Sequence, residues 1–288
     1  MKALFGPAGN CERFYEEKHK SSLEIPKWLS ENGLDAYEYQ CGKGVKISDD
    51  SAIFLGEEAR KYGVSLSVHA PYYISLSSTE EEKRENSIKY ILDTMHAAKL
   101  MGADRIVVHS GSCAKITRRE AMRLTLDTLS KARVEADKEG FEDIFICPET
   151  MGKIQQLGNL EEVVEICETD ERFLPAIDFG HLDARTLGGL KNREDFEYIF
   201  DLIHKKLGGY RAKNFHAHYS RIEHTNQGEK KHHTFAEKEF GPDFDFIGEI
   251  IAERGLTPRI ICESAGTQTD DAIKIQEIYL EKRKVYAK

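Results

Sequence analysis

Several features are missing from this 288-residue sequence, and each absence excludes a class of protein. The six cysteines form no C-x-x-C pair, which excludes a zinc knuckle and a dithiol redox motif. The segment GPAGN at 6–10 does not match the G-x-G-x-x-G fingerprint of a dinucleotide-binding sheet. No apolar segment is long enough to span a bilayer, and no signal peptide opens the chain. We therefore expect a cytoplasmic protein with no membrane contact.

The sequence also has fewer positively than negatively charged residues. Lys and Arg number 41 against 50 Asp and Glu, for a formal net charge of −9. A bare surface of this sign repels the phosphates of nucleic acid. Three bound divalent cations would add 6 to −9 and leave −3, so the acidic sum does not exclude DNA as a partner.

Eight short apolar runs alternate with longer amphipathic segments. This alternation over roughly 250 residues is typical of an α/β protein with a (β/α)8 TIM barrel. We predict a single domain over 1–288, with a metal site at the C-terminal mouth of the strands. The predicted strands are 2–6, 36–40, 65–69, 105–109, 144–149, 174–178, 214–218 and 259–263.

Polar residues and glycines mark the ends of the predicted helices. Ser78 or Thr79 is expected to cap the helix that contains 85–100, and Gly102 to end it. Thr117 and Asn192 are expected to begin the next long helices.

Six successive strands carry residues that can bind a metal ion, and most of these stand at strand ends. In a barrel the C-terminal strand ends surround one mouth, so these side chains converge. Carboxylates crowded there repel each other unless cations lie between them. Nitrogen and oxygen ligands without thiolate favour zinc or manganese. The candidate ligands are His69, His109, Glu149, Asp178, His181, His216 and Glu263.

The segment GEKKHHTF at 228–235 contains the adjacent histidines His232 and His233 after two lysines. Neutral imidazole is the commonest metal ligand, whereas an ammonium group repels a divalent cation. The residues alone leave two interpretations open, a metal-binding loop or a loop with two solvated histidines.

The motifs SVHAPYYISL, VVHSGS, CPET, AIDFGH, NFHAH and ICES occur in an order and spacing that resemble the endonuclease IV family, the type 2 apurinic/apyrimidinic endonucleases. The resemblance covers nearly the whole chain. It implies a TIM barrel with up to three zinc ions that cleaves duplex DNA on the 5′ side of abasic sites during base excision repair. It implies no protein partner.

The resemblance also implies how the ligands are shared. His69, His109 and Glu149 would hold the first ion, and Glu149 would bridge to the second. Asp178, His216 and Glu263 would complete the second set, and His181 would begin the third. Two adjacent metals can activate water and neutralise a phosphate, so Glu149 and Glu263 are the predicted catalytic residues. His218 is interpreted as a polar neighbour that binds no ion.

The third set departs from the family pattern, which takes an Asp-x-His pair from the loop after the seventh strand. Aligned on His232, the aspartate position holds Lys230. We predict that Glu229 replaces the aspartate, that Lys230 and Lys231 point outward, and that His233 binds no ion.

DNA contact is predicted at two loops. The resemblance implies that Tyr72 enters the minor groove and that Tyr73 fills the gap left by an extruded nucleotide. Without the resemblance, an ordinary surface pair of aromatic residues is an equal interpretation. The loop CGKGVK at 41–46 lacks the intercalating arginine of the family, and it either offers Lys43 and Lys46 for phosphate contact or is simply solvated.

Two other functions stay open. A sugar isomerase or epimerase of the xylose isomerase-like barrels would need only Glu149, Asp178, His216 and Glu263, and one or two ions. A damaged-DNA binder that does not cleave would bind abasic DNA at full metal loading without nicking it.

Overall fold

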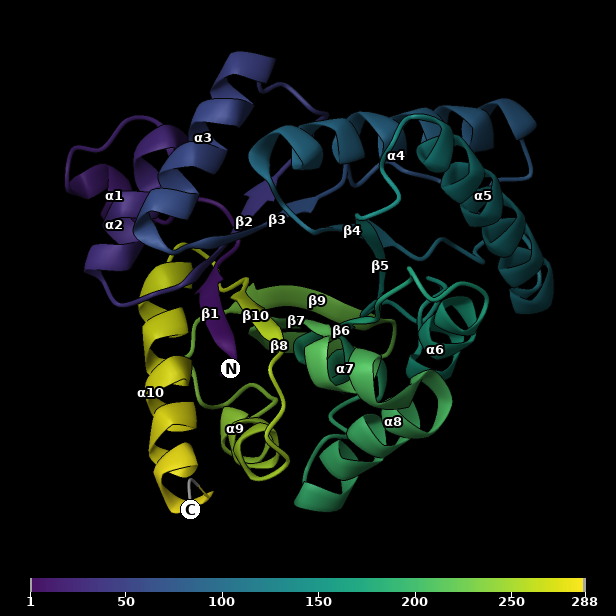
Figure 1. The fold of residues 1–288 in the computed structure, drawn as a ribbon. Helices are drawn as coiled ribbons and strands as arrows, with labels where there is room; N and C mark the ends of the chain where they lie inside the picture. Colours follow the sequence, from purple (N-terminus) through teal and green to yellow (C-terminus); the bar gives the residue numbers. More distant parts are fainter. Residues whose placement is uncertain (1, 287–288) are drawn as a thin grey trace.

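The computed structural model describes residues 2–286, and its eight parallel strands form a ring with the helices outside it (Figure 1). The strand order is β1-β10-β7-β6-β5-β4-β3-β2, and a parallel bridge between Ala8 and Glu38 joins the two ends of this order. The predicted TIM barrel is confirmed. The strands are β1 (Leu4–Pro7), β2 (Ala36–Gln40), β3 (Ser65–His69), β4 (Arg105–His109), β5 (Phe145–Glu149), β6 (Ala176–Asp178), β7 (His216–Tyr219) and β10 (Arg259–Cys262).

Helices connect the strands and cover the outside of the ring. A short 3-10 helix, Ser22–Glu24, precedes the second of them. The α-helices are α1 (Glu12–Glu16), α2 (Ile25–Glu31), α3 (Asp49–Tyr62), α4 (Glu81–Met101), α5 (Arg118–Lys138), α6 (Leu160–Glu168), α7 (Phe179–Arg185), α8 (Arg193–Asn214), α9 (Phe244–Glu253) and α10 (Gln268–Tyr286).

Most of the predicted helix ends are present. Thr117 and Asn192 accept the hydrogen bonds that cap α5 and α8, and Gly102 ends α4 with φ 69°. The predicted cap of α4 is wrong, because this helix begins after Glu80. The hydroxyl of Ser78 accepts a hydrogen bond from the Glu80 N–H at 3.2 Å instead, which makes a turn ahead of the helix.

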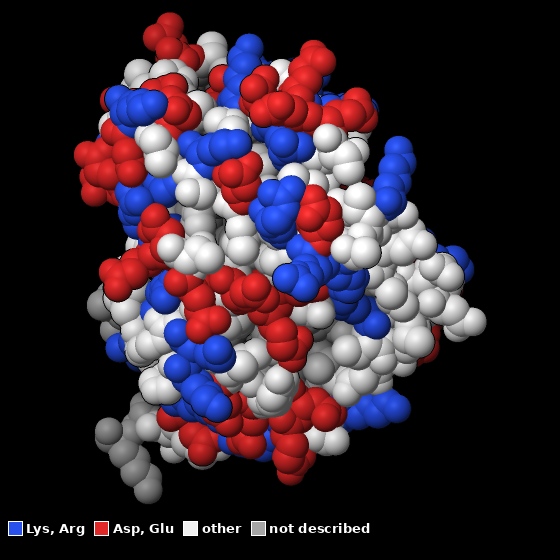
Figure 2. Space-filling view, turned by 90° about the vertical axis from the view of Figure 1, so that its right-hand side faces the viewer, with Lys and Arg blue, Asp and Glu red and all other residues white. Residues whose placement is uncertain are grey.

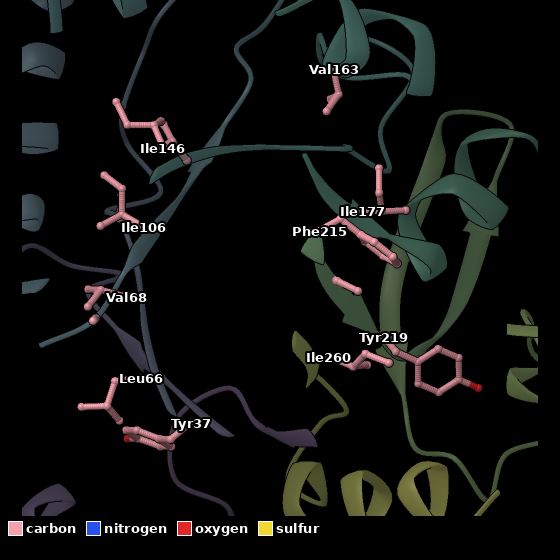
Figure 3. Packing of buried hydrophobic residues seen from close by; sticks show 14 of the residues in the cluster. Tyr37, Leu66, Val68, Ile106, Ile146, Val163, Ile177, Phe215, Tyr219 and Ile260 are labelled. Atoms are coloured by element: carbon pink, nitrogen blue, oxygen red, sulfur yellow. The ribbon is translucent and has the colours of Figure 1, made fainter. Parts of the chain in front are cut away.

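The side chains of each strand alternate between two environments. One set points outward and packs against the helices, and it supplies Leu66, Val68, Ile106, Ile146 and Ile177 to the main apolar cluster (Figure 3). The alternate residues fill the inside of the ring. The register pairs Ala176 with His216 and Asp178 with His218 across β6 and β7. His218 therefore shares a level of the barrel with Asp178, and His216 lies one level deeper.

A two-stranded antiparallel hairpin, β8 (Arg221–Thr225) and β9 (Gly228–His233), follows β7. The sequence interpretation treated this segment as a loop. The hairpin is tied to the loop after β5 by two backbone hydrogen bonds, from Glu229 N to Gly152 O and from Ile154 N to Gln227 O, both 3.1 Å long. This contact places β9 beside the end of β5.

Charged side chains of both signs are interspersed on the face that carries α5, α6 and α8 (Figure 2). This face has no broad field of one sign that could follow a nucleic acid backbone. Among the helices within residues 2–286, none is long and apolar enough to cross a bilayer.

Candidate metal centre

A cavity of about 450 Å³ opens at the C-terminal ends of the strands. The parallel strand direction brings ligands from distant parts of the sequence to this one mouth. The side chains in its wall include Gln40, Tyr72, His69, His109, Glu149, His181, Glu229, His232 and Glu263.

The first ligand cluster joins His69, His109 and Glu149. The Nε2 atoms of both histidines lie 3.4 Å from Oε2 of Glu149. His69 Nδ1 lies 2.8 Å from the carbonyl oxygen of Ala70 and donates to it, so Nε2 is the nitrogen that faces the carboxylate and that an ion can take in place of a proton. Glu149 Oε2 is buried and finds no hydrogen-bond donor among the residues described.

The second cluster joins Glu149, Asp178, His218 and Glu263. His218 Nδ1 lies 3.0 Å from Glu149 Oε1 and 3.6 Å from Glu263 Oε1. Oδ1 of Asp178 accepts from the backbone of His181 at 2.7 Å, whereas its buried Oδ2 has no donor within the described chain. Glu149 thus directs one oxygen to each of the first two clusters.

The structure places His218 in this cluster, where the sequence interpretation placed His216. His216 lies deeper in the barrel, with Nε2 3.0 Å from Oε2 of Glu38. The reason is the strand register, because His218 is the residue level with Asp178. We therefore transfer the proposed ligand role from His216 to His218.

The third cluster joins His181, Glu229 and His232. Glu229 lies beside the two histidines, where the sequence analysis expected it. His181 Nε2 lies 3.5 Å from Glu229 Oε2, and His232 Nε2 lies 3.7 Å from Glu229 Oε1. The Nδ1 atoms are held elsewhere, by the carbonyl of Thr150 at 2.9 Å and the hydroxyl of Ser220 at 2.9 Å. Both Nε2 atoms therefore face the carboxylate of Glu229. Binding of an ion by this cluster stays a prediction.

The neighbours of His232 on β9 lie away from the third cluster. Lys230 is 55% exposed and pairs with Glu223 at 2.6 Å, and Lys231 is exposed. His233 is buried on the other side of the strand, where its ring stacks on Phe240. Alternation of the strand explains Lys231 and His233, which flank His232 and point to the opposite face. Lys230 is the extra residue of a β-bulge, since the pairing passes from Glu223 with Lys231 directly to His224 with Glu229.

The third cluster depends on close contact between the hairpin and the loop after β5. A Cβ added to Gly152 would lie 2.6 Å from Cβ of Glu229 and 2.9 Å from Cδ2 of His181. A Cβ added to Gly228, whose φ is 88°, would lie 2.2 Å from the carbonyl oxygen of Gly152. Glycine at both positions lets the two backbones touch and brings Glu229 over His181.

The carboxylates shift the proton affinities of the histidines around them. Burial opposes a charge on His69, but the nearby Glu149 carboxylate outweighs it and raises the pKa of His69 to about 9. Burial is likewise overcome at His181, where the charges of Asp178 and Glu149 raise the pKa to about 10. Burial raises the pKa of Glu229, but His232 and His181 more than reverse this and lower it to about 2.

The donor set fits divalent metal ions. The three clusters offer imidazole nitrogens and carboxylate oxygens and no thiolate, a combination that zinc and manganese both accept. The buried oxygens Glu149 Oε2, in the first cluster, and Asp178 Oδ2, in the second, lack donors within residues 2–286. A cation in each cluster would offset the cost of burying these charges.

The predicted DNA-contact residues lie near the mouth but differ in setting. Tyr72 is 60% exposed and stands in the cavity wall. Tyr73 packs edge-on against Tyr90 with ring centroids 4.9 Å apart, so part of its ring is already occupied. Lys43 and Lys46 are exposed on the loop after β2 and do not line the cavity. Their contact with DNA stays a prediction.

Two further residues at the site were missed by the sequence interpretation. Lys153, from the loop after β5, adds a cationic side chain to the cavity wall. Glu38 lies fully buried beneath the second cluster. Its signal was the run AYEYQ, which places a carboxylate at an inward position of a buried strand.

The sequence profile described as the xylose isomerase-like TIM barrel matches residues 26–283, and the chain belongs to this family. A relative from Methanocaldococcus jannaschii, called an uncharacterized protein, is 31% identical over 284 residues, which cover 96% of this chain and 97% of that protein. A probable endonuclease 4 of Thermoplasma acidophilum is 28% identical over 59% of this chain and 58% of its own length. A probable endonuclease 4 of Malacoplasma penetrans is 35% identical over 55% of this chain and 48% of its own.

Solved structures of two kinds share the fold. A D-tagatose 3-epimerase-like protein has a TM-score of 0.69 at 21% identity, with 99% of this chain and 98% of that chain covered. Endonuclease IV from Thermus thermophilus has a TM-score of 0.67 at 16% identity, with 98% and 99% covered. At these identities the likeness shows the barrel and does not choose between a sugar and a DNA substrate.

Proposed function

We propose that the protein is a zinc-dependent endonuclease that hydrolyses the phosphodiester bond 5′ of abasic sites in duplex DNA. The observation that carries the proposal is the convergence of three ligand clusters on one mouth, two of which share Glu149. A ketose isomerase of the same barrel type would need only the second cluster. The partial similarity to proteins called probable endonuclease 4 supports the same choice.

The side chains have separate roles in this reaction. Zinc or manganese ions bound there would supply Lewis-acid stabilisation of the phosphate and activation of water. Glu149 sets the spacing of the first two clusters, because one carboxylate oxygen faces each of them. Glu263 is partly exposed in the cavity wall and orients the attacking water.

Residues around the mouth of the cavity would bind the DNA. Tyr72 enters the minor groove beside the abasic site, and Tyr73 fills space left by the extruded nucleotide. Lys153 adds positive charge to the cavity wall, where a phosphate would approach. Lys43 and Lys46 lie farther out on the loop after β2 and would contact the flanking backbone.

A nicking assay on a duplex with one abasic site tests the proposal. We expect a cut on the 5′ side that leaves a 3′-hydroxyl, together with activity that survives brief EDTA treatment and disappears after long chelation. Full activity after verified removal of all metal would overturn the mechanism. Tight binding of abasic DNA without cleavage, at full metal loading, would instead identify a damage binder.

The second candidate is a sugar epimerase or isomerase. Glu149, Asp178, His218 and Glu263 alone form a four-residue ligand set, and this set favours such an activity independently of the other clusters. Incubation of the same metal-loaded preparation with ketoses separates the two candidates. Turnover of a ketose with no cleavage of abasic DNA would select the epimerase.

A further inference from the structure

Glu38 is a carboxylate in the interior of the barrel. It lies on β2 with 0% of its surface exposed, directly beneath the second cluster, and its partners His216, His218 and Ser67 are equally buried. Branched aliphatic side chains usually fill such positions in TIM barrels. A buried carboxylate costs free energy unless it is fully paired, so its presence here calls for a physical reason.

Both oxygens of Glu38 are fully engaged. Oε1 lies 3.0 Å from Nε2 of His218 and accepts from Gln40 at 3.1 Å. Oε2 lies 3.0 Å from Nε2 of His216 and accepts from Ser67 at 2.9 Å. The carboxylate is therefore fixed from β2, β3 and β7 at once.

This pairing determines which nitrogen of His218 is free. A proton on Nε2 is donated to Glu38, so Nδ1, the atom 3.0 Å from Glu149 Oε1, is the nitrogen that an ion at the second cluster can take. His69 and His181 have the opposite arrangement, because Nδ1 donates to a backbone carbonyl and Nε2 faces the cluster. Their partners are neutral carbonyl groups, whereas the partner of His218 carries a charge.

We propose that Glu38 is a positioning residue for the second cluster, which fixes His218 as an Nδ1 ligand and strengthens it as a donor. The inference rests on the proposed ion at the second cluster and is independent of the DNA substrate. A carboxylate that accepts the second N–H of a ligating imidazole orients the ring and raises its basicity.

The trio of Glu38, His216 and His218 is better explained as this support than as an ion site of its own. Each oxygen of Glu38 already faces an imidazole nitrogen at hydrogen-bond distance. No fourth His, Cys, Asp or Glu joins the trio in the part of the chain that the structure describes. All three side chains have no exposed surface.

The variant Glu38→Gln tests the role. A glutamine presents one acceptor and one amide donor, so it cannot accept from both histidines and carries no charge. We expect zinc titration against a competing chelator to show an affinity about 10–100-fold weaker for one ion and unchanged affinity for the others. Ser220→Ala is the matched control, since it removes the partner of His232 and should weaken the third cluster instead.

Melting of the metal-free proteins separates positioning from simple structural support. A lower melting temperature for Glu38→Gln with every zinc affinity unchanged would overturn the proposal. A wild-type protein that binds no ion at the second cluster would overturn the proposed metal centre as well, so the two failures are distinguishable.

If Glu38→Gln does not fold, nuclear magnetic resonance of the zinc-loaded wild-type protein decides the question. Imidazole nitrogen-15 spectra should show His218 protonated at Nε2 and zinc-bound at Nδ1. Zinc bound to Nε2 of His218 would contradict the proposal.

Discussion

The geometry of the third ligand cluster depends on the length of one side chain, that of Glu229. Glu229 starts one residue earlier than the aspartate it is proposed to replace, and its extra methylene brings its oxygens to 3.5 Å and 3.7 Å from His181 and His232. Lys230, at the expected position, turns to Glu223 instead.

Glu229→Gln should therefore lower the number of tightly bound zinc ions by one. The amide has the same shape but lacks the charge that pairs with a cation, so the third cluster should lose its ion. The other two clusters do not contain Glu229 and should keep their ions. Metal analysis by mass spectrometry after dialysis measures the effect. Lys230→Gln is the control and should keep the full complement. An unchanged metal content in Glu229→Gln would show that a different group completes the third cluster.

Tyr72→Ala tests the DNA contact without touching the ligands. Loss of an aromatic ring in contact with bases should weaken binding of abasic DNA by about 1–3 kcal/mol, roughly fivefold to 150-fold in Kd. Metal content should not change. Tyr210→Ala is the matched control and should leave DNA affinity unchanged. Tyr210 is 64% exposed on α8, near the opposite end of the barrel. Equal affinities for Tyr72→Ala and the wild type would remove the minor-groove role.

At the scale of elements, the site depends on how the hairpin packs on the loop after β5. The bridge between Lys153 and Gly228 and the hydrogen bond from Glu229 N to Gly152 O join the two segments. The first and second clusters are built on barrel strands, whereas the third also needs this docking. We expect the third ion to be the most easily lost.

Gly152→Ala should disturb the docking. The new methyl group would meet Glu229 and His181 at less than van der Waals distance, at a cost of about 1–3 kcal/mol in unfolding free energy. Zinc should be lost from the third cluster first. Gly209→Ala is the control, because nothing lies within 4 Å of its added Cβ. Wild-type stability and metal content in Gly152→Ala would show that the third cluster does not depend on close contact between the hairpin and the loop after β5.

The sequence predicted the strands well and the hairpin poorly, for physical reasons. A run such as RIVVH at 105–109 is apolar, short and bounded by charge, so its burial follows from composition. The hairpin segment is mostly polar, and its backbone is also bonded to distant segments, the loop after β5 and Gly241, which the sequence pattern does not reveal. The sequence placed His216 rather than His218 beside Asp178, because position in a motif does not give strand register, which only the paired neighbours fix.

For the whole molecule, proton and metal binding compete at the mouth. The pKa of His69 is about 9 and that of His181 about 10 in the metal-free protein, above the ordinary value near 6.5. Because these folded-state values are raised, the protonated imidazoles stabilise the fold fully below about pH 6.5. This contribution is lost as the pH rises through 9 to 10.

We therefore expect the melting temperature of metal-free protein to fall between pH 7 and pH 10. The zinc-loaded protein should fall less, since the ion takes the place of the protons. Scanning calorimetry of both forms across this range measures the difference. Parallel curves for the two forms would mean that these histidines do not bind the ion.

The most direct test of the account is a crystal structure of zinc-loaded protein with the ions located by anomalous scattering. We expect three ions at the mouth, with His218 Nδ1, His181 Nε2 and His232 Nε2 each about 2.0–2.1 Å from zinc and Glu149 shared by two ions. A single ion held by Glu149, Asp178, His218 and Glu263, with Glu229 in solvent, would contradict the three-metal account and favour a sugar-converting enzyme.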